Sequence, residues 1–180
     1  MSRIGNKKIS IDNKIKLEIK GNNLNVSGTK GNLNLDIPNN INVSFSDTEI
    51  SVSVNDKKDK KQKELHGLMR SLINNMVTGV SVGFEKSLTL QGIGYKVQQK
   101  GKNLIFSLGY SHPVNFDCPD SVEFEVINPT EFKVKSIDKQ KLGQVCAEIK
   151  SLRKRDAYKG KGIHFVGDQI KKKPGKTVKK

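Results

Sequence analysis

The sequence predicts an α+β fold of two similar small domains, each an antiparallel β-sheet packed with one α-helix, followed by a basic tail. Apolar residues alternate with polar ones through two separate stretches of the chain, and each stretch ends in a segment with helical apolar spacing. The two stretches also share turn and strand-breaking residues in the same order, which indicates an internal duplication.

The first stretch begins after a basic segment, residues 1–13, and we expect regular structure to start only beyond that segment. The alternating runs are Ile15–Ile19, Leu24–Val26, Leu33–Ile37, Ile41–Phe45 and Ile50–Val54. Turns rich in glycine and asparagine separate the first three runs, so these runs predict a meander of short antiparallel strands.

A helical period follows the lysine-rich run at 57–63, which we expect to be a solvated loop and first helical turn. The apolar stripe of this helix comprises Leu65, Leu68, Met69, Leu72, Ile73 and Met76. Asp59, with Gln62 three residues later, is the predicted N-cap, and Gly79 is the predicted left-handed residue at the C-terminus. We expect a structural role for His66, which lies beside the stripe.

The same order of elements begins again after Gly83, and a second helix is predicted at about 138–153. Its apolar face comprises Leu142, Val145, Cys146, Ile149 and Leu152. Aligning the two helices makes Cys146 the counterpart of Met69, so we expect this cysteine to lie in a core.

The two halves align at offsets of 77 to 81 residues. Insertions no longer than a loop account for the differences between these offsets. Gly21–Leu24 aligns with Gly101–Leu104, and Pro38 aligns with Pro119. The predicted organisation is an N-terminal α+β domain at 1–82, a C-terminal α+β domain at 83–170 and a basic tail at 171–180.

No stretch of the sequence predicts a membrane helix or a secretion signal. A membrane helix needs roughly 20 apolar residues, and no run approaches that length. Cys118 and Cys146 are too few and too isolated for a disulfide framework or a zinc site. We therefore expect a soluble, unprocessed protein with reduced cysteines.

The sequence offers no support for catalysis. Gly175-Lys176-Thr177 resembles the end of a phosphate-binding loop, but Ile170 occupies a position that requires glycine. Gly92-Ile93-Gly94 begins like a dinucleotide fingerprint, but Val97 occupies the third glycine position, so these glycines instead predict a bulge or a close backbone approach. The three histidines lack partners at ligand or triad spacing. We expect no enzyme activity, cofactor, metal or small-molecule substrate.

The positive charge is concentrated at the C-terminal end of the chain. Residues 150–180 carry a net charge of +10 out of +15, residues 1–80 carry +5, and residues 81–149 are neutral. This asymmetry predicts a polyanionic partner at the C-terminal end.

One part of the basic end, Tyr158–Ile163, has a regular pattern in which glycines alternate with lysines. Such a pattern lets a backbone approach a phosphate–sugar chain closely while the ammonium groups neutralise it, and Tyr158 can stack at the edge. The lysines of the tail form a further cationic arm; they are Lys171, Lys172, Lys173 and Lys176. Solvation alone could account for the tail and for a basic helix end at 153–155, but not for the patterned segment.

These residues resemble one family, protein six of the large ribosomal subunit in its bacterial and organellar form. The resemblance extends over essentially the whole chain, through Ser2–Gly5, Asn75–Val80, Gly92–Tyr95, Leu108–Val114 and Tyr158–Ile163. It implies a duplicated two-domain α+β protein bound to large-subunit rRNA. It also implies a position near the sarcin–ricin loop, beside other ribosomal proteins at the base of the factor-recruiting stalk.

Carried over by residue, the resemblance implies rRNA contacts at Arg153, Lys154, Tyr158, Lys159, Gly160, Lys161 and Gly162. Two departures stand out. Arg155-Asp156-Ala157 replaces a Pro-Glu-Pro-like triplet, and His164 stands where an arginine is common. We therefore expect a less stiff loop, with Arg155 and His164 as weaker contact candidates.

The richness in asparagine and lysine suggests an AT-rich genome, so the expected location is the cytoplasmic ribosome of a bacterium or, alternatively, a plastid ribosome. A stand-alone RNA-binding module acting outside the ribosome is the main alternative function, and sedimentation distinguishes the two. An enzyme acting on RNA would need a converging acid, base or metal set, which the sequence does not show.

Overall fold

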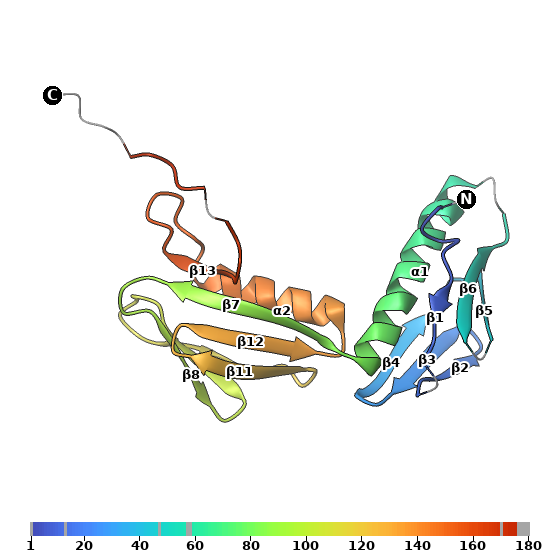
Figure 1. Ribbon diagram of the computed structural model, residues 1–180, viewed down its shortest axis with the longest axis horizontal. Coiled ribbons are helices and arrows are strands. Elements are labelled where there is room, and N and C mark those ends of the chain that lie inside the picture. The colour runs from blue at the N-terminus through green and yellow to red at the C-terminus, as the bar shows by residue number, and fades with distance from the viewer. Residues whose placement is uncertain (1, 13, 47, 57–58, 170, 176–180) are drawn as a thin grey trace. The chain divides into compact units, whose positions relative to one another are not determined.

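The computed structural model describes residues 2–12, 14–46, 48–56, 59–169 and 171–175. The chain divides into two compact units: unit 1 comprises Met1–Phe84 with Ile137–Lys139, and unit 2 comprises Glu85–Ser136 with Gln140–Lys180. Both contain antiparallel strands and one helix, so the predicted α+β class is confirmed (Figure 1). Within the described residues, no helix is long and apolar enough to cross a membrane.

Unit 1 contains two three-stranded sheets. The first is a meander in the order β2-β3-β4, formed by β2 (Lys16–Lys20), β3 (Asn23–Gly28) and β4 (Gly31–Asp36). The second has the order β1-β6-β5 and is formed by β1 (Ile9–Ser10), β6 (Glu49–Val54) and β5 (Ile41–Phe45). All pairings given for the two sheets are antiparallel, as the sequence predicts.

The short strand β1 corrects one expectation, because regular structure begins before residue 13. Ile9 pairs with Ile50 of β6, and only 3% of its surface is exposed. A single buried isoleucine in a basic segment gives too short a pattern to reveal a strand from sequence.

Helix α1 (Lys60–Ser81) begins where predicted and ends later. Asp59 is its N-cap and accepts a hydrogen bond from the Lys61 backbone N–H at 3.0 Å. Gly79 lies inside the helix and is buried; the left-handed residue after the helix is Gly83, at φ 80°. A β-carbon on Gly79 would lie 2.0 Å from the carbonyl oxygen of Ile137, so this glycine permits a close backbone approach within unit 1.

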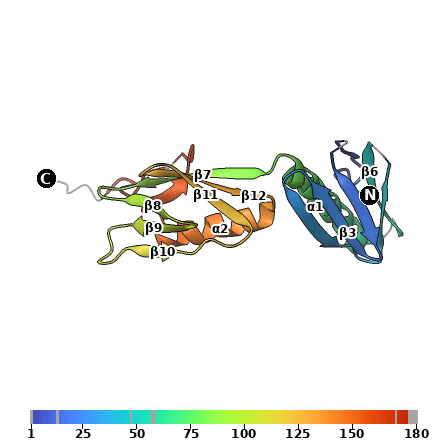
Figure 2. The ribbon, with the colours of Figure 1, turned by 90° about the horizontal axis from the view of Figure 1, so that it is seen from below.

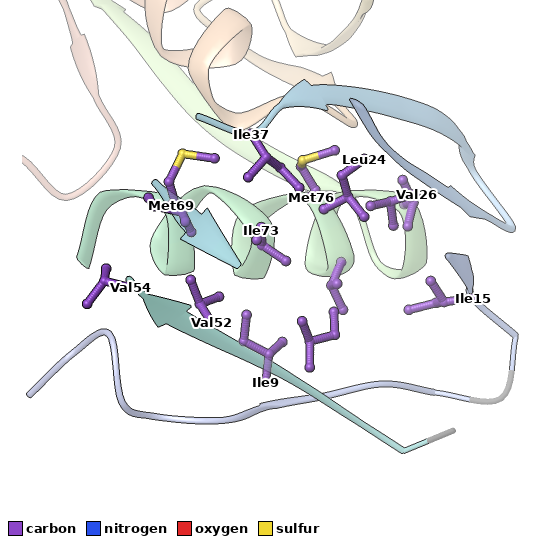
Figure 3. Packing of buried hydrophobic residues seen from close by; sticks show 14 residues of the cluster. Ile9, Ile15, Leu24, Val26, Ile37, Val52, Val54, Met69, Ile73 and Met76 are labelled. Atoms are coloured by element: carbon purple, nitrogen blue, oxygen red, sulfur yellow. The ribbon is translucent and has the colours of Figure 1, made fainter. Parts of the chain in front are cut away.

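The core of unit 1 lies between α1 and the two sheets (Figure 3). The helix buries Met69, Ile73, Met76, Val77 and Val80. Leu68 departs from the predicted stripe, because 52% of its surface is exposed. His66 has the expected structural role: it is buried, and its Nε2 lies 2.9 Å from the carbonyl oxygen of Val52. Lys57 and Lys58 of the lysine-rich run lie outside the described residues.

Unit 2 repeats this plan with one additional strand. Its meander has the order β10-β9-β8, formed by β8 (Lys96–Lys100), β9 (Asn103–Ser107) and β10 (Val114–Phe116). Its second sheet has the order β11-β12-β7-β13, formed by β11 (Val122–Asn128), β12 (Glu131–Ser136), β7 (Phe84–Gln91) and β13 (Gly162–Phe165). Strand β13 has no counterpart among the described residues of unit 1, and it is the strand that positions the basic end of the chain.

Hydrogen bonds at matched positions repeat from one unit to the other. The side-chain amide of Asn23 donates to Asp36 at 2.9 Å, and that of Asn103 donates to Asp117 at 2.7 Å. The carbonyl oxygens of Pro38 and Pro119 each accept a backbone hydrogen bond at 3.0 Å, from Ile41 and Val122 respectively. The predicted similarity of the two halves is therefore confirmed in detail.

Helix α2 (Lys139–Leu152) buries Leu142, Val145, Cys146 and Ile149. Cys146 is fully buried, as predicted for the counterpart of Met69, and this burial raises the pKa of its thiol. In the same unit, Phe106 of β9 packs edge-to-face on Phe132 of β12, with ring centroids 5.6 Å apart.

Candidate nucleic-acid interface

The glycine–lysine loop, residues 153–161, joins the end of α2 to β13. Strand β13 pairs antiparallel with β7, so that Gly162 lies opposite Gln91 and Ile163 lies opposite Leu90. Ile163 is buried, with 1% of its surface exposed. Both ends of the loop are therefore fixed to the folded part of unit 2, one by a helix and the other by a sheet (Figure 1).

Backbone hydrogen bonds close the loop on itself. At its base, the Ile163 N–H donates to the Arg153 carbonyl at 3.1 Å. Further out, the Asp156 N–H donates to the Lys161 carbonyl at 2.7 Å, and the Gly160 N–H donates to the Asp156 carbonyl at 3.0 Å. The loop thus has a defined conformation, although Arg155-Asp156-Ala157 stands in place of a proline-containing triplet.

Gly160 and Gly162 are both buried and have φ values of 75° and 136°. A β-carbon on Gly162 would lie 2.6 Å from the Arg155 Cα and 2.9 Å from the Lys154 carbonyl oxygen. From the sequence, we expected these glycines to admit an RNA backbone. In the structure they allow the loop to fold tightly against its own chain.

Asp156 holds the outer turn of the loop through its side chain. Its Oδ1 accepts the Tyr158 N–H at 3.0 Å, and its Oδ2 accepts the Lys159 N–H at 2.9 Å. These two backbone hydrogen bonds lower the pKa of the Asp156 carboxyl below its usual range. Sequence reasoning missed this function, although an aspartate whose side chain can accept the N–H of the residue two positions later is a known signal for a turn.

The loop exposes its cationic side chains and its tyrosine. Tyr158 keeps 59% of its surface exposed; Lys154, Arg155 and Lys159 are exposed, and Lys161 is partly buried. Within the described residues, none of these lysines or Arg155 takes part in an ion pair with a carboxylate.

Arg153 differs from the other candidates because aromatic residues of unit 2 hold its guanidinium. Its Nε donates to the Tyr95 hydroxyl at 3.1 Å, and its guanidinium lies 4.8 Å from the centroid of the Tyr110 ring. The Tyr110 hydroxyl in turn donates to the Leu152 carbonyl at 2.9 Å. The structure therefore places Arg153 at the base of the loop but gives its side chain a local structural role.

The tail returns to the glycine–lysine loop. The Lys173 N–H donates to the Ala157 carbonyl at 2.9 Å, and the Lys172 side chain lies beside Gly160. Lys171, Lys172 and Lys173 are all exposed, whereas Lys176 lies outside the described residues. Two parts of the sequence that were predicted separately, the patterned segment and the tail, thus form one basic surface.

His164, a weaker contact candidate, is 7% exposed and lies within β13 opposite Thr89. Burial lowers the pKa of its imidazole below 6.5. Its Nδ1 has no hydrogen-bond partner among the described residues. His164 therefore belongs to the sheet rather than to the exposed part of the loop.

The described residues also contain no cluster of three or more side chains suited to a metal ion.

A comparison with protein families matches this chain to the family model described as ribosomal protein L6, over residues 12–83 and 91–165. The first matched segment covers most of the strands and the helix of unit 1. The second runs from the end of β7 through α2 and the glycine–lysine loop to the end of β13.

Proposed function

The chain belongs to the ribosomal protein L6 family, and we propose that the glycine–lysine loop and the adjoining tail form its principal contact with rRNA. Members of this family are structural proteins of the large ribosomal subunit, so the chain is a ribosomal protein that binds rRNA.

The observation that supports this site is the combination of exposed cations with a fixed backbone. Lys154, Arg155 and Lys159 project from a loop closed by hydrogen bonds at its base and at its tip. Asp156, the acidic residue of the loop, directs its carboxylate to backbone N–H groups. The cations are thus held in place, and among the described residues none of them forms an ion pair with a carboxylate.

The proposed mechanism is electrostatic. Each lysine or arginine that reaches a phosphate releases condensed counterions from the RNA, which makes the affinity depend on salt. Contacts to phosphates position a protein without reading bases, so the shape of the RNA supplies most of the specificity. Gly160 and Gly162 contribute by shaping the loop, and Tyr158 can stack or donate a hydrogen bond at its edge.

By family resemblance, we place this surface near the sarcin–ricin loop, with ribosomal proteins of the stalk base as neighbours. Chemical footprinting of large-subunit rRNA, with and without the protein, tests this position. Protection in and around the sarcin–ricin loop is expected. Protection confined to other parts of the rRNA would contradict the placement.

A stand-alone RNA-binding module is the alternative to a ribosomal role, and a bacterial cytoplasmic ribosome, or else a plastid ribosome, is the proposed location. Sedimentation of a cell extract through a low-salt gradient separates these functions. The chain is expected to travel with large subunits. Recovery only in the free fractions, while large subunits run ahead, would support the alternative.

A further inference from the structure

Unit 1 has an apolar pocket of about 270 Å³ between its two sheets. The pocket lies between β2 and β5, which are edge strands of these sheets among the described residues. Three asparagines and one glycine contribute to its lining, and the apolar part comprises Ile19, Ile37, Pro38, Ile41 and Val43. None of the lining residues is charged, although the chain carries a net charge of +15.

In unit 2, side chains bridge the corresponding seam between β8 and β11. Phe116 and Phe124 pack edge-to-face, with ring centroids 6.0 Å apart. The side-chain amide of Gln99, on β8, donates to the Phe124 carbonyl at 3.3 Å and so joins the two strands. Figure 2 shows β8 and β11 side by side. The duplicated fold therefore accommodates aromatic rings at this place.

Unit 1 has different side chains at the matched positions. The residues that align with Gln99, Phe116 and Phe124 are Ile19, Leu35 and Val43, respectively. An isoleucine cannot donate a hydrogen bond across the seam, and neither a leucine nor a valine extends as far as a phenylalanine ring. Ile19 keeps 36% of its surface exposed. The pocket thus lies where the other unit has a pair of aromatic side chains.

We infer that this pocket binds an aromatic side chain of a neighbouring protein in the large subunit. The pocket is smaller than the roughly 300–1,000 Å³ of pockets that enclose small-molecule ligands, so a single side chain suits it better. An extended segment of the neighbour can pair with the edge of β5 and place its side chain in the pocket. The inference is separate from the rRNA contact, which is proposed for unit 2.

The charges around the pocket favour a protein over RNA as the occupant. RNA binding depends on cations that reach phosphates, and no Lys or Arg lines the pocket. Lys20, which follows Ile19, forms an ion pair with Glu18 at 3.3 Å. An uncharged peptide covers this surface without leaving a charge unpaired, whereas the phosphates of an RNA strand would lack cations there. Other ribosomal proteins are also the partners that the family implies.

Transplanting the bridging residues of unit 2 tests this inference. Val43→Phe fills the pocket, and Ile19→Gln supplies an amide like that of Gln99. When large subunits are reconstituted with an equal amount of unaltered chain present, each full-length variant should be incorporated about tenfold less, because the neighbour's side chain loses its buried site. The affinity of both variants for protein-free large-subunit rRNA should stay unchanged, and thermal unfolding should show that both are folded.

Ser44→Phe is the matched control, because Ser44 is exposed and lies on the opposite face of β5 from Val43. It adds the same ring outside the pocket and should be incorporated as the unaltered chain is. Normal incorporation of both pocket variants would overturn the inference, and a loss of their affinity for protein-free rRNA would overturn it in favour of RNA as the occupant. Failure of the unaltered chain to bind rRNA would refute the proposed function instead, so the two failures are distinguishable.

Discussion

Gly162 lies against the backbone of Arg155, so closely that a β-carbon on the glycine would be 2.6 Å from the arginine Cα. This contact brings β13 back onto the start of the glycine–lysine loop. At a φ of 136°, the position also favours glycine on conformational grounds. The shape of the proposed rRNA contact therefore depends on a residue whose own surface is buried.

Gly162→Ala should destabilise unit 2 by about 1–3 kcal/mol, since the alanine is strained and meets backbone atoms that cannot rotate away. It should also weaken rRNA binding although every lysine is retained. Thermal unfolding and filter binding measure the two effects. Gly143→Ala in α2 is the control, because among the described residues outside its own stretch of helix no atom lies within 4 Å of its β-carbon position. Equal stability and equal rRNA affinity of the two variants would show that the close contact between Gly162 and Arg155 does not shape the loop.

Asp156→Ala separates positioning from charge. Removal of a carboxylate beside Lys159 and Lys161 would strengthen binding to a polyanion if only net charge mattered. We expect weaker binding instead, because the Tyr158 and Lys159 N–H groups lose their acceptor and the loop loosens. Asp120→Ala removes the same charge from an exposed turn of unit 2 and serves as the control. Tighter binding by Asp156→Ala would contradict the positioning role.

His164 should make the stability of unit 2 depend on pH. Burial lowers the folded-state pKa of this imidazole below the ordinary value of 6.5. As the pH falls below 6.5, the unfolded chain takes up a proton before the folded chain does, so the free energy of unfolding decreases until the folded-state pKa is passed. Urea unfolding between pH 7.5 and about 5 measures this loss.

His164→Gln should flatten that pH dependence, whatever it does to stability at neutral pH. His112→Gln removes an exposed imidazole from the connection between β9 and β10 and controls for the loss of a histidine. If the free energy of unfolding of His164→Gln depends on pH as it does in the unaltered chain, other titratable groups cause that dependence.

Sequence periodicity was sufficient to predict the α+β class, the duplication and both helices. It failed at places where tertiary contacts override local signals. Ile9 forms a strand because β6 supplies a partner. Gly79 lies within α1 and does not end it, and this glycine instead makes room for the neighbouring backbone of Ile137. Leu68 fits the spacing of the helical stripe, but 52% of its surface is exposed.

The charged residues of the candidate interface could be predicted from the sequence, but the contacts that hold the loop in shape could not. Lysines next to glycines mark the loop in the sequence, but alternation alone does not reveal that Gly160 and Gly162 are buried or that Asp156 fixes the turn. The convergence of Tyr95, Tyr110 and Arg153 depends on residues up to 58 positions apart. Only the folded chain brings them together.

The most direct test of the central claim is the salt dependence of rRNA binding by the double variant Lys159→Ala with Lys161→Ala. Loss of two phosphate contacts should weaken binding and reduce the slope of log affinity against log salt by about one to two units. Lys100→Ala with Lys102→Ala, an equal loss of charge at exposed positions around the turn between β8 and β9, should leave the slope as it is. A slope that does not change in the first double variant would contradict the claim that the glycine–lysine loop binds the rRNA backbone.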